Sequence, residues 1–500
     1  MVFKPNIEDA KIIGYYLGKV IVGLGLFMLL PMLCALIFWE INPMLDFLIG
    51  TGVAFLIGFV FTKICFTEKD LNWMHGMVIV SLSWLVAMAI SALPLYLSGH
   101  FVSFLDACFE TMSGFTTTGL SLVQDLDHLS YSHNLWRHLG PFLGGQGMIV
   151  VALSFFVKGS SGAFKMYVGE ARDERLLPNV IHTSRIIWLI SIIYLILGTL
   201  ILGGIGMLIG MKAPSAFFHG ICIFMAAFDT AGFTPQSSSV IYYHSLLFES
   251  VIIVLMIFGA LNFNFHYQMW SGRRREVWKN IETRAFFISV MFLFFITAIG
   301  LTKLGVYPKA IMLFRKGFFQ LISGHSTTGY MTIYARQFIN EWGNFALVGL
   351  ILAMALGGCI CSTAGGIKML RIGIILKALK EDIKRIILPE KAVMFQKIHH
   401  IKDTFLDDKQ VRGIFLVTLS YIVLYGIGTF IGMFCGYPLL ESLFESTSAA
   451  ANVGFSCGVT DTSMPAVLKI TYIIQMWAGR LEFMSIFTLL GFIVAAIKGK

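Results

Sequence analysis

The sequence predicts an all-α integral membrane protein with ten transmembrane helices, arranged as four pseudo-repeats preceded by an N-terminal helix pair. Three observations support this fold class. Of the 500 residues, 57% are hydrophobic and only 13% are charged, which leaves too few polar side chains to cover a soluble globule. Uncharged runs such as 20–39 and 186–211 are long enough to cross about 30 Å of hydrocarbon as helices. One short segment that ends in glycine recurs four times.

The ten expected spans lie at 16–39, 44–66, 74–97, 134–157, 186–211, 242–266, 284–304, 343–378 (interrupted), 413–435 and 468–497. The connections 158–185, 267–284 and 377–412 are rich in Lys and Arg, whereas 99–133 and 436–467 contain neither residue. The positive-inside rule therefore places the first set, and with it both termini, in the cytoplasm. Because the net charge of +9 follows this topology, it does not indicate a nucleic-acid partner.

Four connections on the outer side contain an additional apolar run of 10 to 16 residues, which is short enough to be re-entrant. Each run ends in a related heptad: SGFTTTG at 113–119, AAFDTAG at 226–232, SGHSTTG at 323–329 and SAAANVG at 448–454. Self-similarity in a fixed register indicates a repeat architecture. We therefore expect a two-helix extension at 1–70, followed by repeats of outer helix, re-entrant helix, loop and inner helix at 71–160, 180–268, 283–380 and 410–500.

Irregular backbone at membrane depth is tolerated only where it is buried in protein or lines a watery cavity. Four such loops must therefore meet, and four loops around one axis form a pore. Segments of small residues can turn their carbonyl oxygens toward that axis and replace the hydration shell of a monovalent cation, and glycine reaches the dihedral angles this requires. The expected ion ligands are Thr117, Thr118, Gly119, Thr230, Ala231, Gly232, Thr327, Thr328, Gly329, Asn452, Val453 and Gly454.

With these four segments, the chain resembles the Trk/Ktr/HKT superfamily of potassium transporters over nearly its whole length. The extra N-terminal pair makes it most similar to the TrkH/TrkG potassium-uptake subunit. The resemblance implies one permeation path, K⁺ as the transported ion and no organic cofactor. It also implies a homodimer in the cytoplasmic (inner) membrane of a bacterium, regulated by a TrkA-type cytosolic nucleotide-binding ring. In that superfamily, glycine at all four filter positions, as found here, is associated with potassium preference, while serine in the first repeat marks many sodium-conducting plant relatives.

The interruption of the eighth span, GGCICSTAGGIK at 357–368, resembles the intramembrane gating loop that the superfamily carries in its third repeat. The expected gate glycines are Gly357, Gly358, Gly365 and Gly366. A simple helix kink is an alternative, whereas a phosphate-binding loop is disfavoured because the spacing is wrong and no strand precedes it.

Arg480 lies near the middle of the last span, and a mid-membrane arginine usually faces a cavity or the bundle interior. It resembles the arginine that projects toward the pore below the filter in this superfamily. The alternative is a structural ion pair with Glu482 or another acid, although residues at i and i+2 of a helix lie on different faces.

Other polar residues allow two interpretations each. Asp229 stands where the superfamily commonly has Asn, and it either adds charge beside the filter or points behind it and accepts hydrogen bonds from backbone amides; we favour the second alternative. Glu110 and Glu445, at the same distance before their glycines, either attract cations or tie the re-entrant helix to the filter. His399 and His400 lie in a charged connection and are expected to be solvated rather than metal-bound.

The sequence therefore predicts potassium uptake through a four-loop filter with an intramembrane gate. Sodium conduction, or non-selective or cation-coupled transport on the same fold, is the alternative within this class. An intramembrane enzyme would need paired catalytic groups, and no such constellation appears on facing spans. A receptor would not require four matching glycine-ended loops.

Overall fold

The computed structural model describes residues 5–147, 165–168, 180–273, 275–389, 397–400 and 402–498. The N-terminal half contains α1 (Ile7–Ile37), α2 (Ile41–Ile64), α3 (Trp73–Leu97), α4 (Phe104–Phe115), α5 (Tyr131–Gly145), α8 (Val180–Leu208), α9 (Ala213–Phe228), η1 (Ser239–Tyr243), α10 (Leu246–Ala260) and α11 (Phe263–Trp270). The C-terminal half contains α12 (Arg275–Lys279), α13 (Ile281–Lys303), α14 (Ala310–Met312), η2 (Leu313–Phe318), α15 (Phe319–His325), α16 (Ala335–Asn340), α17 (Gly343–Ala355), α18 (Met369–Ile387), β1 (Lys397–His400), β2 (Lys402–Phe405), α19 (Asp408–Phe434), α20 (Leu439–Ala450), α21 (Ala466–Arg480) and α22 (Met484–Lys498).

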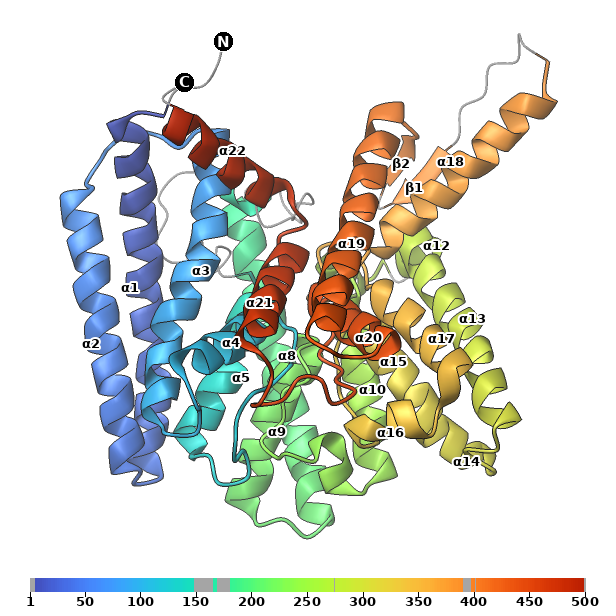
Figure 1. Cartoon of the computed structure of the whole chain (residues 1–500), viewed down its shortest axis with the longest axis horizontal. Helices are drawn as coiled ribbons and strands as arrows, with labels where there is room; N and C mark the ends of the chain where they lie inside the picture. The colour runs from blue at the N-terminus through green and yellow to red at the C-terminus, as the bar shows by residue number, and fades with distance from the viewer. Residues whose placement is uncertain are drawn as a thin grey trace.

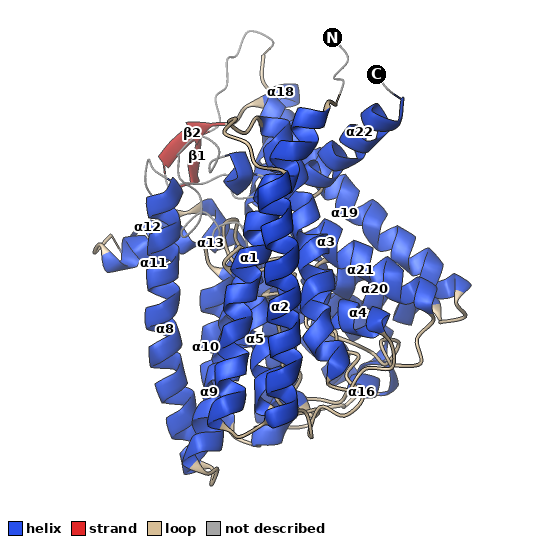
Figure 2. Ribbon diagram, turned by 90° about the vertical axis from the view of Figure 1, so that its left-hand side faces the viewer, coloured by secondary structure: helices blue, strands red, loops and turns tan. Residues whose placement is uncertain are grey.

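The long helices form one bundle, with α1 and α2 packed together on its flank and α1 also against α3 (Figures 1 and 2). Both termini and the antiparallel β1–β2 hairpin lie at one end of this bundle (Figure 1). The loops that precede α5 and α21 lie at the opposite end. The protein is thus an all-α membrane protein apart from one small hairpin, which lies in a connection where the sequence indicates only charge.

Capping residues set the starts of the helices at the end of the bundle that carries the termini. Asn6 and Asp9 form a capping box at the start of α1, and Asn72 and His75 form one at the start of α3. Such boxes satisfy the backbone N–H groups that the first turn leaves without helical partners. His75 Nε2 and Asp9 Oδ1, both largely buried, lie 2.8 Å apart, so the two capping boxes also hold α1 and α3 together.

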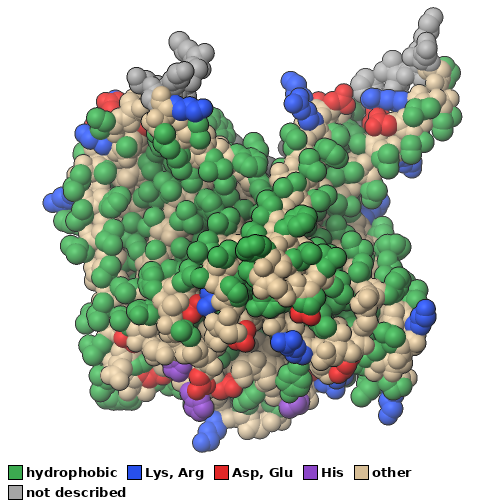
Figure 3. Space-filling view, in the orientation of Figure 1, with side chains coloured by type: hydrophobic (Ala, Val, Ile, Leu, Met, Phe, Trp, Pro, Cys, Tyr) green, Lys and Arg blue, Asp and Glu red, His purple; other side chains and the backbone are tan. Residues whose placement is uncertain are grey.

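The membrane-facing surface is apolar. Figure 3 shows hydrophobic side chains over most of the middle of the visible face, with charged side chains mainly toward its two ends. Large side chains such as Phe292, Phe430 and Ile288 are more than 60% exposed, as expected where lipid replaces water as the solvent. Among the described residues, six helices are long and apolar enough to span a membrane, or eight if each of two bent pairs counts as one span.

The two further spans needed to reach ten stay predictions. Helix α5 covers the first part of the span expected at 134–157 and ends at Gly145, and residues 148–157 lie outside the described residues. The span expected at 343–378 consists of α17 and α18, separated by the irregular segment 356–368, in agreement with the interruption that the sequence indicates.

Two other inner helices are also broken, which the sequence does not reveal. Helix α10 meets α11 at 103°, and α21 meets α22 at 114°. The second bend is made by Glu482 and Phe483, which both adopt positive φ angles. The span expected at 468–497 is therefore two helices joined by a sharp bend. The bend coincides with Arg480 and Glu482, the only charged residues between Lys469 and Lys498.

Candidate functional site

The four helices expected to be re-entrant are α4, α9, α15 and α20. Each of them ends in the same backbone motif. After α4, the N–H of Thr117 bonds the carbonyl of Gly114 at 2.9 Å and the N–H of Thr118 bonds that of Ser113 at 2.8 Å, which is the bonding pattern of a Schellman motif. Thr117 adopts the left-handed conformation, with φ +55°. The same two bonds recur in the other three segments, at Thr230 and Ala231, at Thr327 and Thr328, and at Asn452 and Val453. In each pair the first residue has a positive φ.

This conformation is costly for residues that carry a Cβ, at about 1–2 kcal/mol each, and a helix normally ends on glycine there. The threonine at this position keeps its side chain because that side chain has partners below. Thr117 Oγ1 lies 3.4 Å from the carbonyl of Thr363, and Thr327 Oγ1 accepts the Gly365 N–H at 2.7 Å. In the first three segments the strained threonine therefore joins the predicted filter segment to the loop beneath it. In the fourth, Asn452 donates instead to Thr118 Oγ1 and to the Met476 carbonyl.

The four predicted filter segments form a closed ring. A Cβ at Gly119 would lie only 2.1 Å from the carbonyl oxygen of Ala231, the residue before the glycine of the next repeat. By the same measure, a Cβ at Gly232 would lie 2.1 Å from the Thr328 carbonyl oxygen, and one at Gly329 would lie 2.1 Å from that of Val453. A Cβ at Gly454 would lie 2.0 Å from the carbonyl oxygen of Thr118. The last contact returns to the first repeat, so the repeats succeed one another around a common axis in chain order.

Glycine is required at these four positions for two reasons. Their φ angles are +92°, +66°, +82° and +91°, which L side chains rarely adopt. A Cβ would also occupy the space of a neighbouring carbonyl oxygen. All twelve predicted ligand residues thus lie in one small, largely buried region, although their role as ion ligands stays a prediction.

The segment predicted as a gate lies directly beneath the ring. Thr363 is its central residue, because its hydroxyl lies 2.9 Å from the carbonyl of Gly259 and 3.0 Å from that of Phe228. A Cβ at Gly365 would lie 2.3 Å from the carbonyl of Ala451. The loop therefore contacts the second and fourth repeats from below.

The four predicted gate glycines allow this loop to fold tightly. A Cβ at Gly357 would lie 1.8 Å from the carbonyl of Gly365, and one at Gly358 would lie 2.7 Å from that of Ala260. Gly366 has a φ of +65°. The loop is closed on itself by a bond from the Gly357 N–H to the Ile367 carbonyl at 3.0 Å.

Arg480 lies at the end of α21, next to the bend, rather than in the middle of a continuous span. Its guanidinium donates to the carbonyls of Thr363 and Gly144, both at 2.7 Å, and lies 3.4 Å from Thr117 Oγ1. Glu482 instead pairs with Arg371 at the start of α18. Arg480 is therefore placed under the filter ring, where it joins α5, the loop and the first filter segment.

Asp229 points behind the filter ring. Its Oδ1 accepts a hydrogen bond from Gln146 Nε2 at 2.9 Å, and the residue is fully buried. A Cβ at Gly145 would lie 2.5 Å from the same oxygen. The interpretation in which Asp229 hydrogen-bonds behind the filter agrees with this placement, although this partner is a side-chain amide rather than backbone.

The two outer glutamates tie the re-entrant helices to the chain that follows each filter. Glu110 accepts the Leu122 N–H at 2.9 Å, and Glu445 accepts the Cys457 N–H at 2.9 Å and the Thr460 hydroxyl at 2.7 Å. Both carboxylates are buried. Their geometry favours the structural interpretation over cation attraction.

Buried charged side chains join neighbouring repeats at the end of the bundle opposite the termini. Arg137 Nε donates to Glu110 at 2.8 Å, and its Nη1 reaches the carbonyl of Thr234 in the second repeat at 3.2 Å. Lys469 of α21 pairs with Asp106 of α4 at 2.6 Å. Because buried charges are costly unless paired and hydrogen-bonded, these contacts strongly favour a single relative placement of the repeats.

Sequence reasoning missed several residues of this region. Gly144, Gly259 and Gly479 each bring an inner helix against the last carbonyls of its re-entrant helix, where a Cβ would lie 1.8 to 2.0 Å from a carbonyl oxygen. They follow their filter glycines at nearly constant separations, a signal that was available. Thr363 carried no such signal, because its partners come from other repeats.

His399 is more structured than expected. His399 lies 2.7 Å from Asp403 and 3.0 Å from Glu276, so the β1–β2 hairpin is attached to α12. These bonds raise the pKa of His399 above its usual value of 6.5. Within the described part of the chain, no cluster of three or more His, Cys, Asp or Glu side chains has the geometry of a metal site.

Comparisons with known proteins agree with this architecture. The TrkH family of cation transport proteins matches residues 51–495. An uncharacterized cation transporter of Methanocaldococcus jannaschii is 31% identical over 482 residues, which cover 96% of this chain and 95% of that protein. The Trk system potassium uptake protein TrkG of Escherichia coli is 28% identical and covers 95% of this chain and 97% of its own length.

Among solved structures, the crystal structure of the potassium transporter TrkH from Vibrio parahaemolyticus superposes with a TM-score of 0.81. The match covers 96% of this chain and 98% of that one, at 24% identity. At this identity the likeness shows that the fold is shared, while function must be argued from the site.

Proposed function

The chain belongs to the TrkH family of cation transport proteins, and from that premise we propose that it takes up potassium across the cytoplasmic membrane through a four-segment filter. Members of this family are transporters and not enzymes. The observation that carries the proposal is the ring in which each filter glycine contacts the carbonyl oxygen before the glycine of the next repeat. Such a ring presents backbone oxygens from four sides to a dehydrated cation.

Potassium is the proposed cargo for two reasons. All four ring positions carry glycine, the combination associated with potassium preference in the superfamily that the sequence resembles. The relatives from Escherichia coli are potassium uptake proteins by name. The proposed ligands are the carbonyls of the twelve filter residues, and the proposed domains are the N-terminal extension 1–70 and the four repeats 71–160, 180–268, 283–380 and 410–500.

The loop at 357–367 and Arg480 are the proposed gate. The loop contacts the underside of the ring, and the Arg480 guanidinium crosses the same space. A cation that leaves the filter inward would meet both. Opening therefore requires the loop to withdraw from Thr327 and Arg480 to give up its bonds to Thr363 and Gly144.

We further propose that the protein is a homodimer regulated by a TrkA-type nucleotide-binding ring. The Escherichia coli relatives are named as parts of a Trk system, which supports a regulatory partner. The cytoplasmic end proposed to receive it carries the hairpin and the exposed basic helix α18, which leads directly from the gate loop. Both termini are proposed to lie at this cytoplasmic end.

The test is cation flux into proteoliposomes with K⁺, Rb⁺, Na⁺ or Li⁺ as the sole cation, for the wild type and Gly119→Ser. We expect the wild type to carry K⁺ and Rb⁺ much faster than Na⁺ or Li⁺. The serine Cβ would displace the Ala231 carbonyl, which lies 2.1 Å from its position, and selectivity should fall. Equal sodium and potassium flux in the wild type would overturn the choice of cargo.

A further inference from the structure

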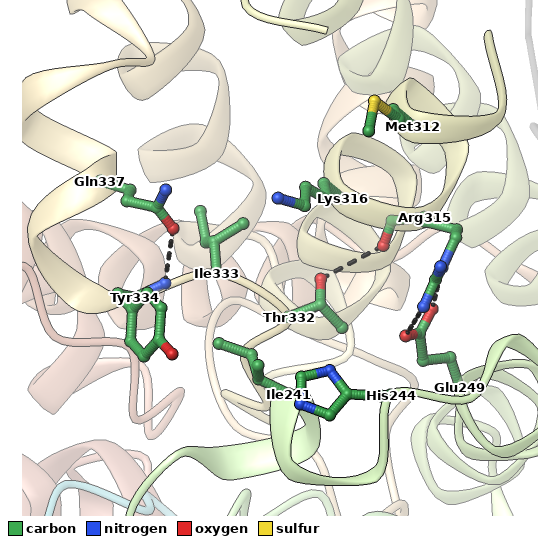
Figure 4. Close-up of a pocket in the computed structure, with 10 residues that line it drawn as sticks. All are labelled: Ile241, His244, Glu249, Met312, Arg315, Lys316, Thr332, Ile333, Tyr334 and Gln337. Carbon is green, nitrogen blue, oxygen red and sulfur yellow. Dashed lines mark hydrogen bonds and ion pairs between the residues drawn. The ribbon is translucent and has the colours of Figure 1, made fainter. Parts of the chain in front are cut away.

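A cavity of about 370 Å³ opens at the outer end of the protein, between the second and third repeats. Figure 4 shows it between η2, the chain that leaves the third filter segment, and the loop that follows η1. It is lined by Ile241, His244, Glu249, Met312, Arg315, Lys316, Thr332, Ile333, Tyr334 and Gln337. A volume of this size is at the lower end of the range for small-molecule sites.

The walls of the cavity are held in place by specific bonds. The Arg315 guanidinium donates two hydrogen bonds to the Glu249 carboxylate, at 2.9 and 2.5 Å. The backbone carbonyl of Arg315 accepts a hydrogen bond from the Thr332 hydroxyl at 3.2 Å. Gln320 also donates to Thr332 Oγ1 at 3.0 Å. Thr332 follows the third filter glycine closely, so the cavity is rigidly connected to the filter.

The charge of Lys316 is what the cavity leaves uncompensated. Glu249 is engaged by Arg315, and Glu341 is held by the Gln337 amide at 2.9 Å. No carboxylate among the described residues pairs with Lys316, whose nearest aromatic ring is Tyr307 at 5.7 Å. In Figure 4 its ammonium group points into the open space toward Gln337.

The third repeat places several basic residues at this end of the protein, and of the Lys and Arg residues that line the cavity only Arg315 has a carboxylate partner among the described residues. The outer connections 99–133 and 436–467 carry no Lys or Arg, and a fixed positive charge at the outer mouth would repel an entering cation. Lys316 also belongs to η2, a π-helical segment, and such segments occur frequently at functional sites. A ligand that neutralises Lys316 would account for both the unpaired positive charge and the π-helical segment that carries it.

We propose that this cavity binds a small oxyanion of the phosphate or carboxylate class, with Lys316 as its principal charged ligand. His244 and Tyr334 line the same cavity, and because the Tyr334 hydroxyl points away from Lys316 in Figure 4, the His244 ring is the further donor. Ile241, Met312 and Ile333 form an apolar wall that suits the organic part of a phosphate ester. The anion is either free in solution or the headgroup of a lipid.

The bound anion would also act on transport. By neutralising Lys316 near the third filter segment, it removes a repulsive charge and should increase cation entry. This consequence rests on the proposed function, whereas binding itself does not. Anion binding and cation flux are therefore measured separately.

The test is binding of inorganic phosphate to the purified full chain at constant ionic strength, measured by calorimetry in detergent and in phosphatidylcholine vesicles. The variants are Lys316→Gln, Lys316→Arg and, as a matched control, Lys309→Gln, which removes an exposed charge outside the cavity. We expect Lys316→Gln to weaken binding at least about tenfold, since charge-assisted bonds dominate oxyanion recognition. Lys316→Arg and Lys309→Gln should bind as the wild type does.

A second arm distinguishes the source of the anion. If vesicles containing phosphatidylglycerol abolish phosphate binding in the wild type, the natural occupant is a lipid headgroup; if they do not, it is a free anion. Absence of phosphate binding in detergent and in phosphatidylcholine vesicles overturns the proposal, as does equal weakening by Lys309→Gln. Potassium flux that fails to respond to phosphate, with binding intact, would reject only the effect on transport.

Discussion

The bond between the gate loop and the third filter segment allows a direct test of gating. Thr327 Oγ1 accepts the Gly365 N–H at 2.7 Å, and Thr327 is fully buried. Thr327→Val preserves the shape and β-branching of the side chain but removes the acceptor. Thr327 is a proposed ion ligand through its backbone carbonyl, which the substitution retains, so the change removes only the side-chain bond to the loop.

The magnitude follows from the burial of this bond. A buried N–H that loses its partner costs about 1–3 kcal/mol. Because water reaches the Gly365 N–H once the loop withdraws, the cost falls on the closed arrangement alone. Since every 1.4 kcal/mol is a factor of ten, the ratio of open to closed protein should rise roughly 5- to 150-fold.

The assay is open probability in planar bilayers, combined with Rb⁺ influx into proteoliposomes. Thr328→Val is the matched control, because the Thr328 hydroxyl pairs with Ser326 at 2.7 Å behind the filter and does not contact the loop. We expect Thr327→Val to open more often with unchanged K⁺ to Na⁺ selectivity. If it opens no more often than the wild type, or if Thr328→Val opens equally, the loop does not gate through this bond.

Three further outcomes follow from the structure. Glu445→Gln should lose roughly 2–4 kcal/mol of stability, because the buried carboxylate accepts several hydrogen bonds. Its melting temperature in detergent should fall, whereas the exposed control Glu68→Gln should melt as the wild type does. Equal melting temperatures for the wild type and both variants would contradict this role of Glu445. Asp229→Asn keeps an acceptor for Gln146, so potassium uptake should match the wild type between pH 6 and 8, and a pH-dependent loss would instead support a charge beside the filter. Since Asp403 and Glu276 raise the pKa of His399 above 6.5, the protonated imidazole stabilises the attached hairpin fully below about pH 6.5 and progressively less as pH rises through the raised pKa. The protection of the β1 and β2 amides from hydrogen exchange, relative to their intrinsic exchange rate at each pH, should therefore fall as pH rises in the wild type, and an equal fall in His399→Gln would refute this attachment.

The fold class could be predicted because its causes are local. Composition, span length and the asymmetry of basic residues depend on neighbouring positions, and so do the four heptads at 113–119, 226–232, 323–329 and 448–454. The interruption at 357–368 was visible for the same reason, since its glycines are concentrated in one stretch. The bends after α10 and α21 were not predicted, because a single polar residue (Asn262) or two isolated charges (Arg480 and Glu482) in an apolar stretch do not distinguish a break from a continuous helix.

The environments of individual polar residues needed the tertiary structure. Arg480 could be placed beneath a filter by resemblance, but its partners Gly144 and Thr363 belong to two other repeats. The alternatives for Asp229 and Glu445 differed only in which way each carboxylate points. Their hydrogen-bond partners, which the fold supplies, favour one direction for each.

The sequence by itself determined that the chain crosses a membrane and repeats one glycine-ended segment four times, because hydrophobicity and spacing are properties of short stretches. Only the tertiary structure decided that Gly119 contacts Ala231 and that Gly454 returns to Thr118. These contacts join residues more than a hundred positions apart, and they depend on how four separate helix pairs pack. The physical reason is that a carbonyl oxygen from another repeat occupies the space where a Cβ would lie at each filter glycine.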